Sequence, residues 1–106
     1  MKIILFGSGQ GGQMVARWLP AAGELLAFAD NNPQKQGTVL GQVPVISPEQ
    51  IPAMGPDLVW ITVLNREAVL KIEGQLRDLG YGGEIRTLNP FRDLMDLRLA
   101  QVRLLA

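Results

Sequence analysis

The feature that most constrains the fold is a junction near the amino terminus, where the apolar run IILF (residues 3–6) continues directly into GSGQGGQ (residues 7–13). A continuous apolar run without polar alternation is typical of a parallel strand that is covered on both faces. The MVARWL that follows carries apolar residues at helical spacing. The segment therefore predicts a buried strand, a tight glycine turn and a helix.

The rest of the chain continues this alternation of strands and helices. Strands that alternate with helices through short turns indicate a parallel sheet with helices on both faces. We therefore expect a three-layer, Rossmann-like α/β fold with about five strands in the order 3-2-1-4-5. The expected strands are residues 2–6, 25–29, 43–46, 57–63 and 84–88, and the expected helices are residues 10–19, a short helix after Ser47, residues 66–79 and a last helix from Pro90.

The length of 106 residues is enough for one buried core and too small for two lobes. We expect a Rossmann-like domain over residues 1–90 and a separate C-terminal helix over residues 91–106. Apolar residues lie toward two sides of this helix, which makes its apolar surface wider than one core face requires. This favours a homodimer contact or a junction to a further domain, and the alternative is a terminal helix that frays into solvent.

The composition excludes several classes of function. Ten basic and ten acidic residues cancel, so no broad positive field attracts nucleic acid or an anionic membrane. The chain has no cysteine and no histidine, which excludes the usual zinc sites and Ser-His-Asp catalysis. No apolar stretch approaches the roughly 20 residues of a membrane span, and MKIILF is too short for a signal peptide. We expect a cytoplasmic protein without a metal site.

The glycine cluster carries the candidate ligand site. Gly7, Gly9 and Gly12 match a Gly-x-Gly-x-x-Gly turn, in which the first glycine permits the bend, the second admits a pyrophosphate and the third allows close packing. The main-chain amides at the helix start would face the anion, so no lysine is needed. The alternative is a purely structural turn. The candidate binding residues in this loop are Gly7, Ser8, Gly9, Gln10, Gly11 and Gly12.

An acidic residue follows the second predicted strand. Asp30 lies 18 positions beyond Gly12, where a carboxylate is placed to accept hydrogen bonds from a ribose and to repel a 2′-phosphate. This position favours NAD over NADP, although a uridine nucleotide also carries a ribose. Asn31 and Asn32 are candidates for the base pocket. The alternative for Asp30 and the two asparagines is a turn that they form themselves.

A second polar cluster follows the predicted strand 57–63. The sequence TVLNRE places Thr62, Asn65 and Arg66 near the crevice where such sheets bind ligands, and Arg66 could pair with a phosphate. The alternative readings are a helix cap for Asn65 and a solvated first-turn residue for Arg66. Trp60, inside the apolar strand, is expected in the core.

Two segments, KIILFGSGQGGQMVARWL and LLAFADNNPQKQGTVLGQVPVISPEQI, resemble small NAD(P)- or nucleotide-sugar-binding Rossmann domains of bacterial glycan and secondary-metabolite enzymes. Those domains include CoA-binding-like domains of epimerases, amino-terminal domains of sugar acyltransferases and domains that precede FkbM-type methyltransferases. The resemblance covers roughly the first 90 residues. The residues that carry it are Gly7, Gly9 and Gly12, then Phe28, Asp30, Asn31 and Pro33, then Gly41, Pro44 and Val45, and finally Ser47, Pro48 and Glu49.

Three functions follow as hypotheses. The resemblance implies a small-nucleotide-binding module, for NAD or a UDP-sugar, in the amino-terminal part of a larger sugar- or metabolite-modifying enzyme and non-catalytic by itself. The alternative is a structural or oligomerisation domain with no retained ligand. An independent oxidoreductase of the short-chain type would need a lysine four residues after Tyr81, where this chain has Ile85. No catalytic residue is therefore predicted, and whether the chain is an enzyme stays open.

Overall fold

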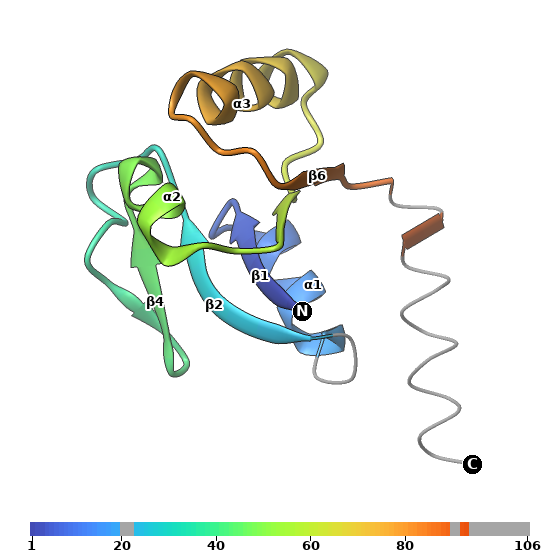
Figure 1. The fold of residues 1–106 in the computed structure, drawn as a ribbon. Coiled ribbons are helices and arrows are strands. Elements are labelled where there is room, and N and C mark those ends of the chain that lie inside the picture. The colour runs from blue at the N-terminus through green and yellow to red at the C-terminus, as the bar shows by residue number, and fades with distance from the viewer. Residues whose placement is uncertain (20–22, 90–91, 94–106) are drawn as a thin grey trace.

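A computed structural model describes residues 1–19, 23–89 and 92–93 of the chain. Strands and helices alternate through most of this sequence (Figure 1). The strands are β1 (Lys2–Phe6), β2 (Glu24–Ala29), β3 (Val39–Leu40), β4 (Val43–Ile46), β5 (Leu58–Ile61) and β6 (Glu84–Thr87). The helices are α1 (Gln10–Trp18), the 3-10 turn η1 (Pro48–Gln50), α2 (Ile51–Met54) and α3 (Arg66–Asp78).

The strands form one mixed sheet in the order β3-β4-β2-β1-β5-β6. All neighbouring pairs are parallel except β3 and β4. The α/β prediction is confirmed, and the five predicted strands keep their predicted order. The prediction of about five strands is corrected to six, because the two-residue strand β3 adds an antiparallel edge. Gly41, with φ at +63°, makes the tight turn that joins β3 to β4.

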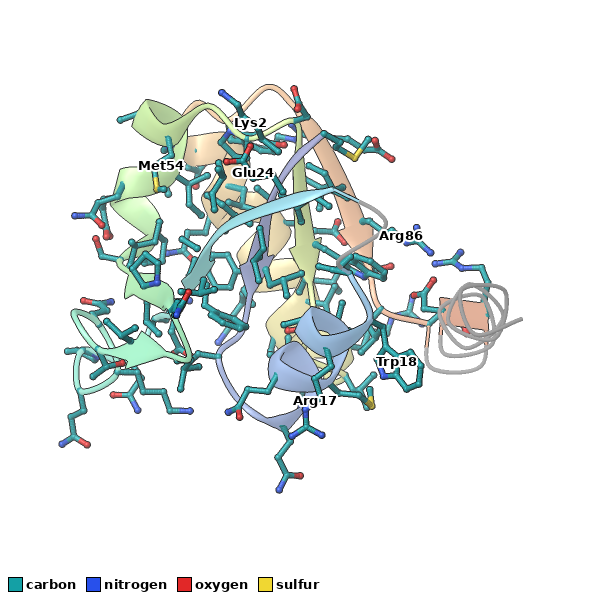
Figure 2. The ribbon with its side chains drawn as sticks, turned by 90° about the horizontal axis from the view of Figure 1, so that it is seen from below. Lys2, Arg17, Trp18, Glu24, Met54 and Arg86 are labelled. Carbon is teal, nitrogen blue, oxygen red and sulfur yellow. The ribbon has the colours of Figure 1, made fainter. Side chains whose placement is uncertain are left out.

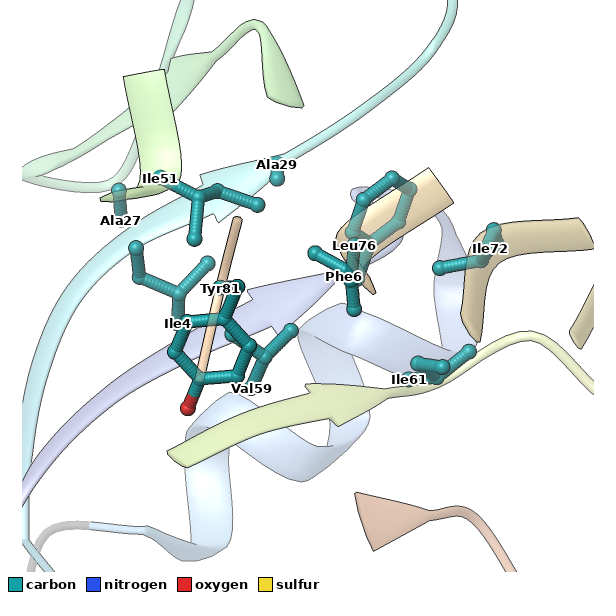
Figure 3. Close-up of a cluster of buried hydrophobic side chains, with 10 residues drawn as sticks. All are labelled: Ile4, Phe6, Ala27, Ala29, Ile51, Val59, Ile61, Ile72, Leu76 and Tyr81. Carbon is teal, nitrogen blue, oxygen red and sulfur yellow. The ribbon is translucent and has the colours of Figure 1, made fainter. Parts of the chain in front are cut away.

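Helices cover both faces of the sheet, so the predicted layering is also observed (Figure 1). On one face, Val15 of α1 and the following Leu19 pack on apolar side chains of β1, β2, β4 and β5. On the other face, Ile51 of α2 and two residues of α3, Ile72 and Leu76, pack on the sheet (Figure 3). The four residues of β5 are all buried, as expected of a strand covered on both sides.

The chain after β6 is anchored to the sheet by charge. Arg86 forms an ion pair with the fully buried Asp93, and its guanidinium lies 4.3 Å from the ring centroid of Trp60. Figure 2 shows Arg86 on β6. Burial alone would raise the pKa of Asp93, but hydrogen bonds from Arg92, the Asn89 N–H and Arg86 lower it by more, so the net pKa lies below the usual value for an aspartate. Trp60 is a core residue, as expected.

The predicted C-terminal helix is described only at Arg92 and Asp93, and its other residues, 91 and 94–106, lie outside the described part of the chain. The Asn89 side-chain oxygen accepts a hydrogen bond from the Arg92 N–H at 3.1 Å, as expected of a helix cap. Within the described ranges, no helix is long and apolar enough to span a bilayer.

The parallel strands bring their carboxyl ends to one edge of the sheet, where Gly7, Asp30 and Thr62 follow β1, β2 and β5. The Gly7 N–H donates to the Ala29 carbonyl at 2.8 Å, and the Thr62 N–H donates to the Phe6 carbonyl at 3.0 Å. Lys2 and Glu24, at the starts of β1 and β2, lie opposite each other in the strand register at the other edge (Figure 2). The loops after β1, β2 and β5 are therefore held side by side.

Candidate functional site

Three glycines of the loop are required by the protein's own packing. A Cβ added at Gly12 would lie 1.9 Å from the Gly7 carbonyl oxygen, and one at Gly11 would lie 2.6 Å from the Thr62 carbonyl oxygen. Gly7 has a φ of +122°, and a Cβ there would lie 2.7 Å from Thr62 Oγ1. Real Cβ atoms do not approach oxygen this closely, so the loop and the end of β5 pack without room for side chains.

Gly9 differs from these three glycines. No atom lies within 4 Å of a Cβ placed there, and its φ of −81° and ψ of −160° are open to any residue. Gly9 is also the N-cap residue of α1. Because glycine has no side chain, it provides no capping oxygen for the first N–H groups of the helix. The fold therefore does not need a glycine here, and the space above Gly9 is open to a ligand.

The open space is part of a cavity of about 340 Å³ between the glycine loop and the loop after β5. It combines one helix N-terminus with the carboxyl ends of two adjacent strands, the place where open α/β sheets bind ligands. Residues from both loops line it: Gly7, Gly9, Gln10, Gly11, Gly12, Thr62, Val63, Leu64 and Asn65. Four of the glycines, Gln10 and Asn65 are thus brought together, whereas Ser8, Asp30, Asn31 and Arg66 do not line this cavity.

Thr62, which the sequence placed near this crevice, lines the cavity and has a structural role in the site. Its side chain is buried at 3% exposure, and its Oγ1 lies 3.1 Å from the Phe6 carbonyl and 3.3 Å from the Gly7 carbonyl. The hydroxyl therefore ties the end of β5 to the start of the glycine loop. Its place directly after a buried strand was predicted from the sequence, whereas its hydrogen bonds to the two carbonyls were not.

Asp30 is joined to the glycine loop through Ser8. Its Oδ2 accepts hydrogen bonds from the Ser8 hydroxyl at 2.6 Å and from the Ser8 N–H at 3.1 Å, and its Oδ1 accepts from the Asn32 N–H at 2.9 Å. Ser8 is buried at 4% exposure. The carboxylate therefore both fixes the loop and begins its own turn, so one of the two alternatives for Asp30, the turn cap, is present in the structure.

These hydrogen bonds set the charge of Asp30. Burial alone would raise its pKa, but the hydrogen bonds from the Ser8 hydroxyl, the Asn32 N–H and the Ser8 N–H, together with the charge of Lys35, lower it by more. The net pKa lies below the usual value for an aspartate, so the carboxylate is ionised at neutral pH.

The lowered pKa of Asp30 predicts an acid-sensitive contribution to stability. A folded-state pKa below the unfolded one stabilises the fold above about pH 4, and this stabilisation is lost as the pH falls through the folded-state pKa. We expect Asp30→Asn to lower the unfolding free energy by about 1 kcal/mol at pH 7 and by less at pH 3. Urea unfolding of both proteins across this range measures the difference, and a difference that does not change with pH would contradict the assignment.

Asn31 turns away from the cavity. Its side-chain amide forms two reciprocal hydrogen bonds with Gln75 of α3, one at 3.0 Å and one at 2.8 Å. The neighbouring Asn32 accepts a hydrogen bond from the Gln34 N–H at 3.0 Å, which forms a local turn. The two asparagines therefore stabilise the β2–β3 connection and its contact with α3.

The cluster after β5 is divided in the same way. The Asn65 side-chain oxygen accepts a hydrogen bond from the Ala68 N–H at 3.0 Å, so Asn65 caps α3 while it lines the cavity. Arg66 is exposed on the first turn of α3, and its side chain makes no hydrogen bond or ion pair with the described residues. Gln13 donates from its side chain to the Ser8 carbonyl at 3.1 Å, which supports the glycine loop from within α1.

Comparisons with known proteins agree with this architecture. A family model described as C2185-like, N-terminal, matches residues 1–84. A search of curated proteins finds no match to this chain. The structure of UDP-D-quinovosamine 4-dehydrogenase from Vibrio fischeri is 20% identical and has a TM-score of 0.66, with 90% of this chain and 83% of that chain covered.

Two further solved structures share the fold. RSP, a Rex-family repressor, in complex with β-NADH, is 17% identical with a TM-score of 0.64, covering 98% of this chain and 62% of its own. A variant of perosamine N-acetyltransferase from Caulobacter crescentus, in complex with CoA and GDP-perosamine, is 20% identical with a TM-score of 0.60, covering 76% of this chain and 40% of its own. The chain thus spans about three fifths and two fifths of these proteins, and the likeness shows a Rossmann-like fold.

Proposed function

The chain belongs to the C2185-like, N-terminal family, and from this premise we propose that it binds a small nucleotide, NAD or a UDP-sugar, through the diphosphate at the glycine loop. One observation carries the proposal. Gly7, Gly11 and Gly12 are explained by the packing of the protein itself, but Gly9 borders open space in ordinary backbone geometry. Gly9 also lines the cavity at the start of α1, where a ligand that approaches the main chain explains a glycine that the fold does not need.

The surrounding groups support a diphosphate. The first turn of the nine-residue helix α1 directs main-chain N–H groups and the positive end of the helix dipole toward the cavity. The structural neighbours that share this fold were solved with β-NADH in one case and with CoA and GDP-perosamine in another. Gly7, Ser8, Gly9, Gln10, Gly11 and Gly12 would form the phosphate cradle, with Asp30 near the ribose. Asn65 and Arg66 would lie beside the cradle, and Asn31 would act only through the turn that it stabilises.

The ionised Asp30 supports NAD rather than NADP. The 2′-phosphate of NADP would place a negative charge beside the negative carboxylate of Asp30. Among the described residues, Lys35 is the cation that lowers the pKa of Asp30 and could offset this repulsion. We expect NADP to bind about 10-fold more weakly than NAD. Isothermal titration calorimetry of the chain with both dinucleotides and with a UDP-sugar measures this ratio. Equal affinity for NAD and NADP would contradict the role of Asp30, and no heat with any of these ligands, CoA or S-adenosylmethionine would contradict nucleotide binding.

The wider role is part of the same proposal. The module would serve as the amino-terminal part of a larger cytoplasmic sugar- or metabolite-modifying enzyme, with residues 91–106 as the dimer contact or the junction to the catalytic domain. One neighbour, the Rex-family repressor, was also solved with operator DNA. The balance of ten basic and ten acidic residues supports a nucleotide partner over nucleic acid for this chain.

A structural or oligomerisation domain without a ligand is the second candidate. The observation that favours it is the extent to which the predicted binding side chains are already occupied. Asp30 is bonded to Ser8, Asn31 to Gln75 and Asn65 to the Ala68 N–H. Under this alternative, sedimentation would show a dimer while every nucleotide titration stayed flat.

A further inference from the structure

The acceptor capacity of Asp30 is nearly filled by the protein. An ionised carboxylate offers about four acceptor positions, two on each oxygen. The Ser8 hydroxyl and the Ser8 N–H occupy both positions on Oδ2, and the Asn32 N–H occupies one position on Oδ1. One acceptor position therefore remains, and it lies on Oδ1.

A ribose presents two adjacent hydroxyl donors, 2′ and 3′, to an acidic residue at this place in a dinucleotide-binding fold. A single free acceptor position satisfies one of them. The Ser8 hydroxyl does not substitute for the missing acceptor, because Ser8 is buried at 4% exposure and a ribose hydroxyl does not reach its oxygen. The second ribose hydroxyl is thus left to solvent.

We propose that Ser8 is a specificity-determining residue of the nucleotide site, because its hydroxyl occupies the acceptor position that would otherwise bind the second ribose hydroxyl. This inference rests on the proposed function. The site then binds only one of the two ribose hydroxyls. It therefore tolerates nucleotides in which the second hydroxyl is removed or replaced by a neutral group. The charge of Asp30 still disfavours a phosphate on that carbon.

The loop is rigid enough for this selection. Ser8 is held at three atoms, since its N–H and hydroxyl donate to Asp30 and its carbonyl accepts from the Gln13 side chain at 3.1 Å. The hydrogen bond between the Ser8 hydroxyl and Asp30 is charge-assisted and short at 2.6 Å. A ribose hydroxyl would have to displace this bond to reach Oδ2, and it would gain little more than it removes.

The experiment titrates the wild-type chain and Ser8→Ala with NAD, 2′-deoxy-NAD and 3′-deoxy-NAD by calorimetry. In the wild type we expect one deoxy analogue to bind within about 2-fold of NAD and the other about 10-fold more weakly. In Ser8→Ala, the freed Oδ2 position accepts the second hydroxyl. The affinity for NAD then rises by about 5- to 10-fold, and each deoxy analogue binds about 10-fold more weakly than NAD.

Ser8→Gly removes the same hydroxyl and serves as a second variant, and thermal unfolding verifies that both variants are folded. A wild type that loses equal affinity with both deoxy analogues overturns the inference, as does a folded Ser8→Ala with the wild-type order of affinities. In these cases NAD still binds and the proposed function stands. A wild type that binds none of the three dinucleotides overturns the inference and removes the NAD form of the proposed function. If neither variant folds, the two deoxy analogues on the wild type decide alone.

Discussion

Replacing Gly9 with alanine is expected to leave the fold intact and to weaken NAD binding by about 30-fold, which corresponds to about 2 kcal/mol. The added Cβ meets no protein atom within 4 Å and takes up an ordinary φ, so the protein accepts it. The same methyl group would occupy the space where the diphosphate approaches the main chain. Calorimetric titration with NAD measures the loss of affinity, and thermal unfolding measures the stability of the variant.

A second variant, Gly9→Ser, controls for the small loss of stability that is expected in Gly9→Ala. Alanine is a poorer N-cap than glycine, so Gly9→Ala should lose up to about 1 kcal/mol of unfolding free energy. Gly9→Ser introduces a capping hydroxyl while it still fills the space, so it should regain the stability lost in Gly9→Ala without regaining the affinity of the wild type. Wild-type NAD affinity in a folded Gly9→Ala would move the diphosphate away from this loop.

Replacing Gly12 with alanine is expected to destabilise the fold, by about 2 kcal/mol or more, and to lower the melting temperature by about 10 °C. Its Cβ would lie 1.9 Å from the Gly7 carbonyl oxygen, and backbone on both sides of that contact must shift. Alanine's higher helix propensity, about 1 kcal/mol, offsets only part of this cost. Urea and thermal unfolding measure the loss.

Gly74 provides the matched control for Gly12. It also lies inside a helix, α3, but it is exposed and a Cβ there meets no atom within 4 Å. Gly74→Ala should therefore raise the unfolding free energy by up to about 1 kcal/mol and leave NAD binding unchanged. The same substitution in two helices thus has opposite signs. A Gly12→Ala variant as stable as the wild type would contradict the close contact between position 12 and the Gly7 carbonyl oxygen.

The strand order and the glycine loop were predictable because they depend on long local patterns. The continuous apolar run of β1 and the spacing of Gly7, Gly9 and Gly12 each indicate one conformation with little competition. The strand β3 was missed because Val39–Leu40 is only two residues long and exists through its pairing with β4. The turn signal at Gly41 was present, but a turn alone does not define the strand before it.

Side-chain partners were less predictable, because they depend on residues far away in the sequence. Asn31 was a candidate for a base pocket, and its partner Gln75 lies 44 residues further along the chain. Ser8 and Asp30 were both candidates for the ligand, but the bond between them, across 22 residues, required the positions of β1 and β2. Local composition identifies such residues as polar and well placed, and the tertiary fold decides which donor each acceptor receives.

Thr62 gives the loop a constraint that extends beyond any one glycine. Gly7, Gly11 and Gly12 would each collide with Thr62 or with a carbonyl that its hydroxyl contacts if they carried a side chain. The glycine loop and the end of β5 are therefore packed against each other, and neither can change its conformation unless the other changes too. A single substitution there is therefore expected to be tolerated only together with a compensating one, whereas position 9 can change without disturbing this corner of the domain.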